Sequence, residues 1–501
     1  MNKFHFHICD DEGWRVEIPG LPELTEYGAW RGYSKNEEKY LWPSFGSGPI
    51  ADEKVSHGCG FYTREDFIEI VKYASARNIE IIPEVDMPGH ARAAIKSMEK
   101  RYQKLMAENK ENEAKEYLLT DFEDKSEYQS VQGWTDNVIN VGMESSYNFL
   151  TKVTDELVKM FKDAGVELKC IHTGGDEVPA GIWSKSPECD KVLKENKEYS
   201  KPLDLGRYFI RRFSKILADR NITAGGWEEI GLLHGTEIHP NPEFVGQNIR
   251  TYVWNNMWNS GAEDIGYQLA NAGYPVVLAN VTNLYFDLAY HKHPKEPGYY
   301  WGNFIDTRKA WEYTPMDLSK CAEFDRFGQP VNSENVIRKE NHLTRKGEAN
   351  VLGIQGLLWS ENNLGLERLE YFMFPKLLGL AERAWAEQPS WVKKNNSEKG
   401  KQQKEATWNE FVNTAGQRDF KRMDYMNKGI GYRVATPGAK IIDGMLHANI
   451  RYPGLIIRYT TNGEEPTVNS PEYKAPVKVS GAVKLKVFTS NGRGSRTVEV
   501  K

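Results

Sequence analysis

Short apolar segments alternate with amphipathic helical patterns along most of the chain, and this alternation restricts the folds open to it. Seven segments are predicted to be strands, and they begin near residues 4, 79, 169, 222, 250, 275 and 351. Helical patterns lie between them, over about 63–77, 145–164, 205–219 and 263–272. Nearly continuous apolar strands separated by helices predict an α/β fold with a parallel sheet covered on both faces. Because polar and aromatic residues follow the strands, we expect the C-terminal mouth of a (β/α)8 TIM barrel.

A closed barrel of this type needs eight strands, and only seven are recognised. We expect the missing strand to be the first one and to precede residue 1, because no helix stands before the strand near residue 4. The alternative is a strand hidden inside one of the loops. We therefore predict a catalytic-type barrel without its first strand over residues 1–425 and a small antiparallel β-sandwich over residues 426–501. The polar segment 398–406 is predicted to be a surface loop.

Composition excludes several classes of function. Lysine and arginine total 65 against 70 acidic residues, and no basic block is interleaved with aromatics, so a nucleic-acid partner is not expected. No apolar run reaches the roughly 18 residues of a membrane span. The five cysteines lack metal-binding spacing, and their odd number argues against a disulfide framework. The 14 Trp and 25 Tyr suit the stacking of sugar rings, although such side chains also fill cores.

The segment Lys169–Val178 combines a buried strand with two adjacent acids. Gly174 and Gly175 end the strand, and Asp176 and Glu177 follow directly. Neighbouring side chains of a regular strand point to opposite faces, so both acids can serve one pocket only where the strand has ended. Two partly desolvated carboxylates repel, which pushes one of them to hold a proton near neutral pH. A carboxylate beside a carboxylic acid is the equipment of glycosidases, whereas a plain acidic surface loop is the alternative.

Several separated motifs extend this interpretation. They are His172–Glu177, His7–Arg15 and Ile82–His90, followed by Asn283–Asp287, Tyr299–Gly302, Leu358–Glu361 and Ala381–Trp385. With these motifs the chain resembles the family 20 glycoside hydrolases, which are β-N-acetylhexosaminidases, and among them the bacterial chitobiases. The segments Tyr432–Ala439 and Ile457–Gly463 resemble the immunoglobulin-like C-terminal domain of chitobiases.

The resemblance implies a role for each matching residue. Glu177 corresponds to the general acid, and Asp176 corresponds to the residue that orients the acetamido group of the substrate, which itself acts as the nucleophile. Asp10 and His90 match supporting members of a triad with Glu177, and Tyr285 matches the hydroxyl that holds the acetamido oxygen. Trp227, Trp254 and Trp359 match aromatic walls around the terminal sugar. Asp287 and Glu361 match acceptors for sugar hydroxyls, and Trp301 matches a residue that stacks on the second sugar. The resemblance implies no metal and no organic cofactor.

The family resemblance also implies features that this sequence does not display. Family members carry an arginine at the end of the first barrel strand, and that strand is the one expected upstream of residue 1. The implied substrates are β-linked N-acetylhexosamine oligosaccharides or glycans, cleaved from the end. Periplasmic, cell-surface or secreted location in a bacterium is expected from the resemblance alone. The sequence leaves the oligomeric state open.

Two other functions remain open at this stage. One is a non-catalytic carbohydrate-binding protein. The other is a metal-dependent barrel hydrolase, because His5 and His7 place two imidazoles on one face of a strand.

Overall fold

A seven-stranded parallel sheet organises the N-terminal part of the molecule. The computed structural model describes residues 1–43, 47–234, 238–394 and 397–501. The strands of the sheet, in spatial order, are β1 (Lys3–His7), β4 (Glu80–Glu84), β5 (Cys170–His172), β6 (Thr223–Trp227), β9 (Ile249–Val253), β10 (Val276–Leu278) and β11 (Val351–Ile354). Each predicted strand is thereby confirmed. Gln355, directly after β11, lies 3.1 Å from the Nδ1 atom of His5 on β1, so the sheet curls until its two edge strands approach each other.

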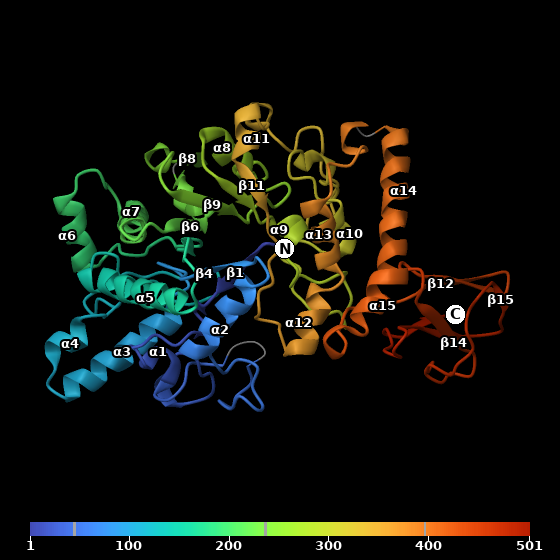
Figure 1. Cartoon of the computed structure of the whole chain (residues 1–501), viewed down its shortest axis with the longest axis horizontal. Coiled ribbons are helices and arrows are strands. Elements are labelled where there is room, and N and C mark those ends of the chain that lie inside the picture. The colour runs from blue at the N-terminus through green and yellow to red at the C-terminus, as the bar shows by residue number, and fades with distance from the viewer. Residues whose placement is uncertain (44–46, 235–237, 395–396) are drawn as a thin grey trace. The chain divides into compact units, whose positions relative to one another are not determined.

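Helices pack on this sheet, as Figure 1 shows. The main helices of this part are α2 (Arg64–Ser75), α3 (Arg92–Ala107), α5 (Glu144–Asp163), α6 (Pro187–Glu195), α7 (Leu205–Ala218), α8 (Ile265–Ala272) and α11 (Arg345–Asn350). Helix α2 begins at a capping box, in which the Thr63 hydroxyl accepts from the backbone N–H of Asp66 and the Asp66 carboxylate accepts from the backbone N–H of Thr63. The order of strands and helices confirms the predicted α/β barrel class.

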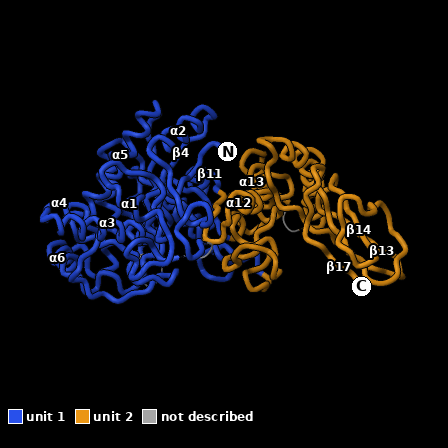
Figure 2. The backbone as a smooth tube through the Cα atoms, turned by 90° about the horizontal axis from the view of Figure 1, so that it is seen from below, with its two compact units in different colours: residues 1–281, 331–355 blue, residues 282–330, 356–501 orange. Residues whose placement is uncertain are grey.

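The chain forms two compact units, coloured separately in Figure 2. The first comprises residues 1–281 and 331–355 and holds the whole parallel sheet, and the second comprises residues 282–330 and 356–501. The sequence predicts a domain boundary near residue 425, whereas the division into compact units does not fall there. The boundary near residue 425 stays a prediction. No described helix is long and apolar enough to cross a membrane.

The second unit combines helices with the small β domain. Its helices are α10 (Thr307–Trp311), α12 (Leu366–Met373), α13 (Lys376–Trp385), α14 (Glu398–Thr414) and α15 (Phe420–Met423). Its strands form two antiparallel sheets, β12 (Gly438–Ile442), β13 (Met445–Asn449) and β15 (Val477–Lys478) in one and β14 (Ile456–Thr460), β16 (Val483–Phe488) and β17 (Val498–Val500) in the other. Leu446, Val483, Leu485 and Val487 are buried in its core. The predicted small β-sandwich is confirmed.

One local prediction is wrong. The segment 398–406 forms the first half of α14 instead of a surface loop. Ser397 caps this helix by accepting from the N–H of Gly400, and Trp408 and Val412 further along bury their side chains among other aromatic residues. Packing at the C-terminal half therefore stabilises a helix whose polar first turns gave no periodic signal.

Candidate active site

The predicted acids stand on a strand end that turns through left-handed backbone. Gly174 and Gly175 have φ values of 70° and 101°, and Glu177 itself has a φ of 51°, which is uncommon outside glycine. A Cβ atom on Gly174 would lie 1.7 Å from Asp86 Oδ1, so only glycine fits there. The strand has thus ended before the acids, as predicted, and the unusual backbone of Glu177 is a type of strain that clusters at functional sites.

Both acids face one histidine. His90 Nε2 lies 3.5 Å from Asp176 Oδ2 and 3.4 Å from Glu177 Oε2. On its other side, His90 Nδ1 lies 3.2 Å from Asp10 Oδ1, whereas the neighbouring Asp11 is 4.0 Å away. The first unit therefore brings together four of the predicted residues, Asp10, His90, Asp176 and Glu177, with the imidazole between the carboxylates.

The charges in this cluster shift its protonation. Burial alone would lower the pKa of His90, but the carboxylates of Asp10 and Asp176 outweigh it and raise this pKa well above its ordinary value. Burial would raise the pKa of Asp10, yet His90 and His7 outweigh it and lower that pKa. The resting cluster therefore contains an imidazolium held by carboxylates.

The two catalytic candidates differ in a way the sequence did not reveal. Burial, with the repulsion of Glu177, raises the pKa of Asp176 to about 6 despite the opposing charge of His90. Burial also acts on Glu177, but contact with His90 and a hydrogen bond from Gln132 Nε2, 2.6 Å from Oε2, lower its pKa. One acid is pushed toward protonation, as predicted, but in the resting site it is Asp176, the reverse of what an acid role for Glu177 requires.

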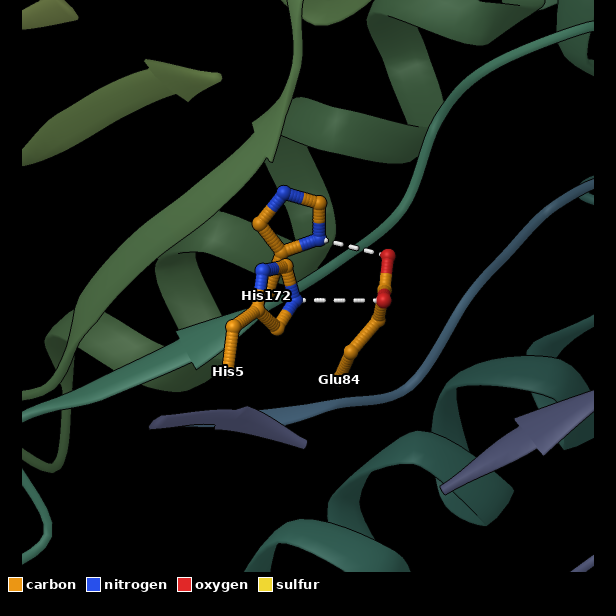
Figure 3. A group of neighbouring side chains, drawn as sticks. All are labelled: His5, Glu84 and His172. Atoms are coloured by element: carbon orange, nitrogen blue, oxygen red, sulfur yellow. Dashed lines mark ion pairs between the residues drawn. The ribbon is translucent and has the colours of Figure 1, made fainter. Parts of the chain in front are cut away.

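A second group of charged side chains lies behind the first. Glu84 Oε2 is 2.5 Å from His7 Nδ1 and 3.1 Å from His5 Nε2, and Glu84 Oε1 is 2.8 Å from His172 Nδ1. In Figure 3, His5, Glu84 and His172 point toward one another from β1, β4 and β5. His7 Nε2 also lies 2.8 Å from Asp10 Oδ2, so His7 links the two groups.

The cluster around Glu84 contains the ligand types of a metal site, as the metal-hydrolase alternative requires. Two imidazoles and a carboxylate are a set that zinc takes. The same side chains also pair with one another: burial alone would raise the pKa of Glu84, but the three imidazoles outweigh it and hold this pKa well below its ordinary value. Burial lowers the pKa of His172 to about 4, so its imidazole is neutral near pH 7. A buried ion-pair network explains the arrangement without a metal.

Two predicted tryptophans belong to the first unit. Trp227 ends β6 and is 1% exposed, with its ring centroid 4.7 Å from that of His172. Trp254 directly follows β9, and its Nε1 donates to Glu229 Oε1 at 3.4 Å. Trp227 packs among the buried rings, whereas Trp254 is only half-buried.

The other predicted residues lie in the second unit. Tyr285 forms a ring contact with Trp301 at 5.9 Å between centroids and with Trp359 at 6.2 Å. The backbone N–H of Trp359 donates to Asp287 Oδ1 at 3.3 Å, and burial raises the pKa of Asp287 to about 6. Glu361 is exposed two residues beyond Trp359. This unit thus gathers Tyr285, Trp301, Trp359 and Asp287 into one group.

Sequence reasoning missed several residues of the first group. Gln132 lies in an irregular segment and gave no signal, although it donates to Glu177. His7 and Glu84 stand inside the motifs His7–Arg15 and Ile82–His90, where charged side chains in an apolar strand were the available clue. Glu228 and Glu229 follow β6; Glu228 is buried and Glu229 is half-buried, and burial raises the pKa of Glu228 to about 8. Glu228 accepts from the N–H groups of Trp254 and Asn255, which fixes the chain after β9.

Comparison with known proteins places this geometry in a family. Residues 1–388 match the catalytic domain of glycosyl hydrolase family 20, and residues 419–497 match the chitobiase/beta-hexosaminidase C-terminal domain. The chain is 37% identical over its whole length to a beta-hexosaminidase of Vibrio vulnificus and 36% identical to an N,N'-diacetylchitobiase of Vibrio harveyi. In each case it spans 59% of the relative's length.

A solved structure agrees with these relatives. The crystal structure of a GH20 exo beta-N-acetylglucosaminidase from Vibrio harveyi, in complex with N-acetylglucosamine, matches with a TM-score of 0.62 and 30% identity. The match covers 87% of this chain and 54% of that one. From the family match over residues 1–388 and the relatives that align along the full chain, it follows that the protein belongs to glycosyl hydrolase family 20.

Proposed function

We propose that the protein is an exo-acting, retaining β-N-acetylhexosaminidase that removes terminal N-acetylglucosamine or N-acetylgalactosamine from β-linked glycans or chitooligosaccharides. The observation that carries the proposal is the convergence of Asp176, Glu177 and Asp10 on His90 at a strand end that has turned through left-handed backbone. Family membership, and relatives named beta-hexosaminidase and chitobiase, support the same activity.

The reaction uses the substrate as its own nucleophile. The acetamido oxygen attacks the anomeric carbon while the bond from that carbon to the leaving oxygen breaks, and Glu177 gives its proton to the leaving oxygen. Asp176 accepts a hydrogen bond from the acetamido N–H and stabilises the positive charge that develops in the oxazolinium ring. Water then opens this ring from the face the leaving group left, with Glu177 taking its proton, so the anomeric configuration is retained.

Substrate binding supplies the protonation pattern that the reaction needs. In the resting site Asp176 has the higher pKa and Glu177 the lower one. An acetamido N–H donated to Asp176 favours its anion, whereas a sugar that displaces water from Glu177 favours the neutral acid. Substrate binding therefore lowers the pKa of Asp176 and raises that of Glu177, and the imidazolium of His90 lies between the two carboxylates.

The decisive experiment is hydrolysis of a β-linked N-acetylhexosaminide by the protein. We expect cleavage of an aryl N-acetyl-β-glucosaminide, no cleavage of the matching β-glucoside that lacks the acetamido group, and a β-anomer as the first product in NMR spectra. A thiazoline analogue of the oxazoline should inhibit. Efficient cleavage of the plain glucoside, or an α-anomer as first product, would contradict the substrate-assisted reaction.

The same assay separates the two alternatives. A non-catalytic carbohydrate-binding protein would bind chitobiose without cleaving it. A metal-dependent hydrolase would lose its activity in a chelator and regain it with zinc, whereas the proposed reaction continues unchanged.

We also propose that the protein acts outside the bacterial cytoplasm, in the periplasm, at the cell surface or after secretion. The family resemblance supports this location. Activity found only in the cytoplasmic fraction after cell fractionation would contradict it.

A further inference from the structure

The second unit contains a buried lysine for which neither the sequence nor the proposed reaction gives a task. Lys376 begins α13 and is 0% exposed. Its Nζ atom donates to the backbone oxygens of Phe286 and Leu288, each at 2.7 Å. These two peptide groups flank Asp287, the predicted acceptor for a sugar hydroxyl. Burying an ammonium group is costly, and burial lowers the pKa of Lys376 to about 7, so the two hydrogen bonds have to offset that cost.

A tyrosine connects Lys376 to the C-terminal β domain. Lys376 Nζ lies 3.9 Å from the centroid of the Tyr290 ring, and the guanidinium carbon of Arg433 lies 4.4 Å from the same centroid. The Tyr290 hydroxyl donates toward the backbone oxygens of Tyr371 and Phe374, which fixes the ring. Cations over the face of a desolvated aromatic ring are attracted to it.

A fully buried carboxylate completes the connection. The side chain of Glu296 is 0% exposed and accepts from Arg433 Nε at 2.7 Å and from Arg496 Nη2 at 2.6 Å. The Tyr371 hydroxyl donates to the same carboxylate at 2.7 Å. Arg433 and Arg496 both belong to the region that matches the chitobiase C-terminal domain. Two arginines of that region thus hold the far end of the segment that carries Asp287.

We propose that Lys376, Tyr290, Arg433 and Glu296 are positioning residues that fix the backbone of residues 286–296 so that Asp287 meets the sugar. The inference rests on the proposed function, because it concerns recognition of the same sugar. It gives the C-terminal β domain a task within its own chain: it braces a substrate-binding segment, and it is not an independent carbohydrate-binding module. These buried charges keep Asp287 in position, because a displaced Asp287 would form a weaker hydrogen bond to the sugar hydroxyl.

The test is a double-mutant cycle in the full-length protein, with the inhibition constant of N-acetylglucosamine and the KM and kcat of an aryl glycoside as readouts. Lys376→Met should weaken N-acetylglucosamine binding about tenfold, the effect of losing charge-assisted hydrogen bonds, while kcat changes much less. Asp287→Ala should weaken binding at least as much. The double variant should bind no worse than Asp287→Ala, because Lys376 acts through Asp287.

Further variants keep the test decisive. Tyr290→Leu and Arg433→Met should each weaken binding about threefold, and they replace Lys376→Met if that variant fails to fold. Arg458→Met is the control, because Arg458 belongs to the same C-terminal region but pairs with a carboxylate of that region, that of Glu472, instead of one in the segment 286–296. This control should bind N-acetylglucosamine as the wild type does.

The outcomes distinguish the brace from the proposed function. A wild-type protein that neither cleaves nor binds N-acetylglucosaminides would overturn the proposed function. An active wild type whose Lys376→Met variant keeps normal affinity, or whose effects add to those of Asp287→Ala, would overturn the brace alone. A fall in melting temperature with unchanged affinity would assign these residues to folding only.

Discussion

The two groups of predicted site residues differ in the kinds of side chain that they contain. In the first unit, Asp10, His90, Asp176 and Glu177 form a network of charges backed by a second one around Glu84. In the second unit, Tyr285, Trp301 and Trp359 form ring contacts, and Lys376 donates hydrogen bonds to the backbone oxygens on either side of Asp287. The first group can move protons, whereas the second can hold a sugar. We therefore expect variants of the first to change kcat and the pH profile, and variants of the second to change affinity.

The largest effect is expected at Glu177. Glu177→Gln keeps the shape but cannot donate the proton, so kcat should fall by roughly 10²–10⁴ on a substrate with a poor leaving group. On a substrate whose leaving group departs as a stable anion, kcat should fall much less. The measurement is kcat on a series of aryl N-acetyl-β-glucosaminides of decreasing phenol pKa. Equal loss along the series would remove Glu177 from the acid role.

Asp176 comes next. Asp176→Asn cannot stabilise the positive charge of the oxazolinium ring, and loss of such electrostatic stabilisation costs about 10²–10³ in kcat. Steady-state kinetics on an aryl N-acetyl-β-glucosaminide measure it, with KM expected to change far less than kcat. A wild-type kcat in this variant would contradict the expectation that residues of the first unit determine kcat.

A smaller effect is expected at Tyr285, in the second unit. Tyr285→Phe keeps the ring contacts but removes the hydroxyl predicted to hold the acetamido oxygen. Loss of that hydrogen bond should lower kcat/KM about tenfold. The matched control is Tyr300→Phe, an exposed tyrosine next to Trp301 with no predicted role. If both variants behave alike, the predicted role of the Tyr285 hydroxyl is wrong.

Within the second unit, Trp301 tests whether binding of the second sugar can be separated from binding of the first. Its side chain is 40% exposed and is predicted to stack on the second sugar. Trp301→Ala should raise KM for chitobiose about threefold to tenfold, the scale of one aromatic stacking contact, and leave KM for an aryl monosaccharide nearly unchanged. Parallel kinetics on the two substrates measure the difference. A similar rise on both would place Trp301 against the first sugar.

A separate effect concerns stability, which should change in the direction opposite to activity. The folded-state pKa of Asp176, about 6, lies above its ordinary value of 3.8, so the folded protein binds this proton more readily than the unfolded chain. That contribution to stability is complete below about pH 4 and is lost as the pH rises through 6. Asp176→Asn should therefore stabilise the protein at pH 7 by at most about 3 kcal/mol while reducing activity. Denaturant unfolding at pH 4 and pH 7 checks it, and an unchanged pH slope would contradict it.

Single elements show how much of the fold could be predicted from the sequence. All seven strands of the sheet were predictable because each is a short apolar run between helical patterns. The start of α14 was not predictable, because its first turns are polar and contain Gly400. This helix depends on the burial of Trp408 further along. Gln132 was beyond reach for a similar reason, since a residue of an irregular segment gives no sign of the carboxylate it contacts.

By itself the sequence determined the alternating fold, the glycine-broken strand end and the pairing of Asp176 with Glu177, because these depend on neighbours along the chain. Tertiary structure alone decided which acid has the higher pKa in the resting site, since burial and the position of His90 shift both values. It also decided which groups Lys376 and the two C-terminal arginines contact, because these partners are 88 to 200 positions away in sequence. Energies that depend on burial and on distant charges cannot be read from a local pattern.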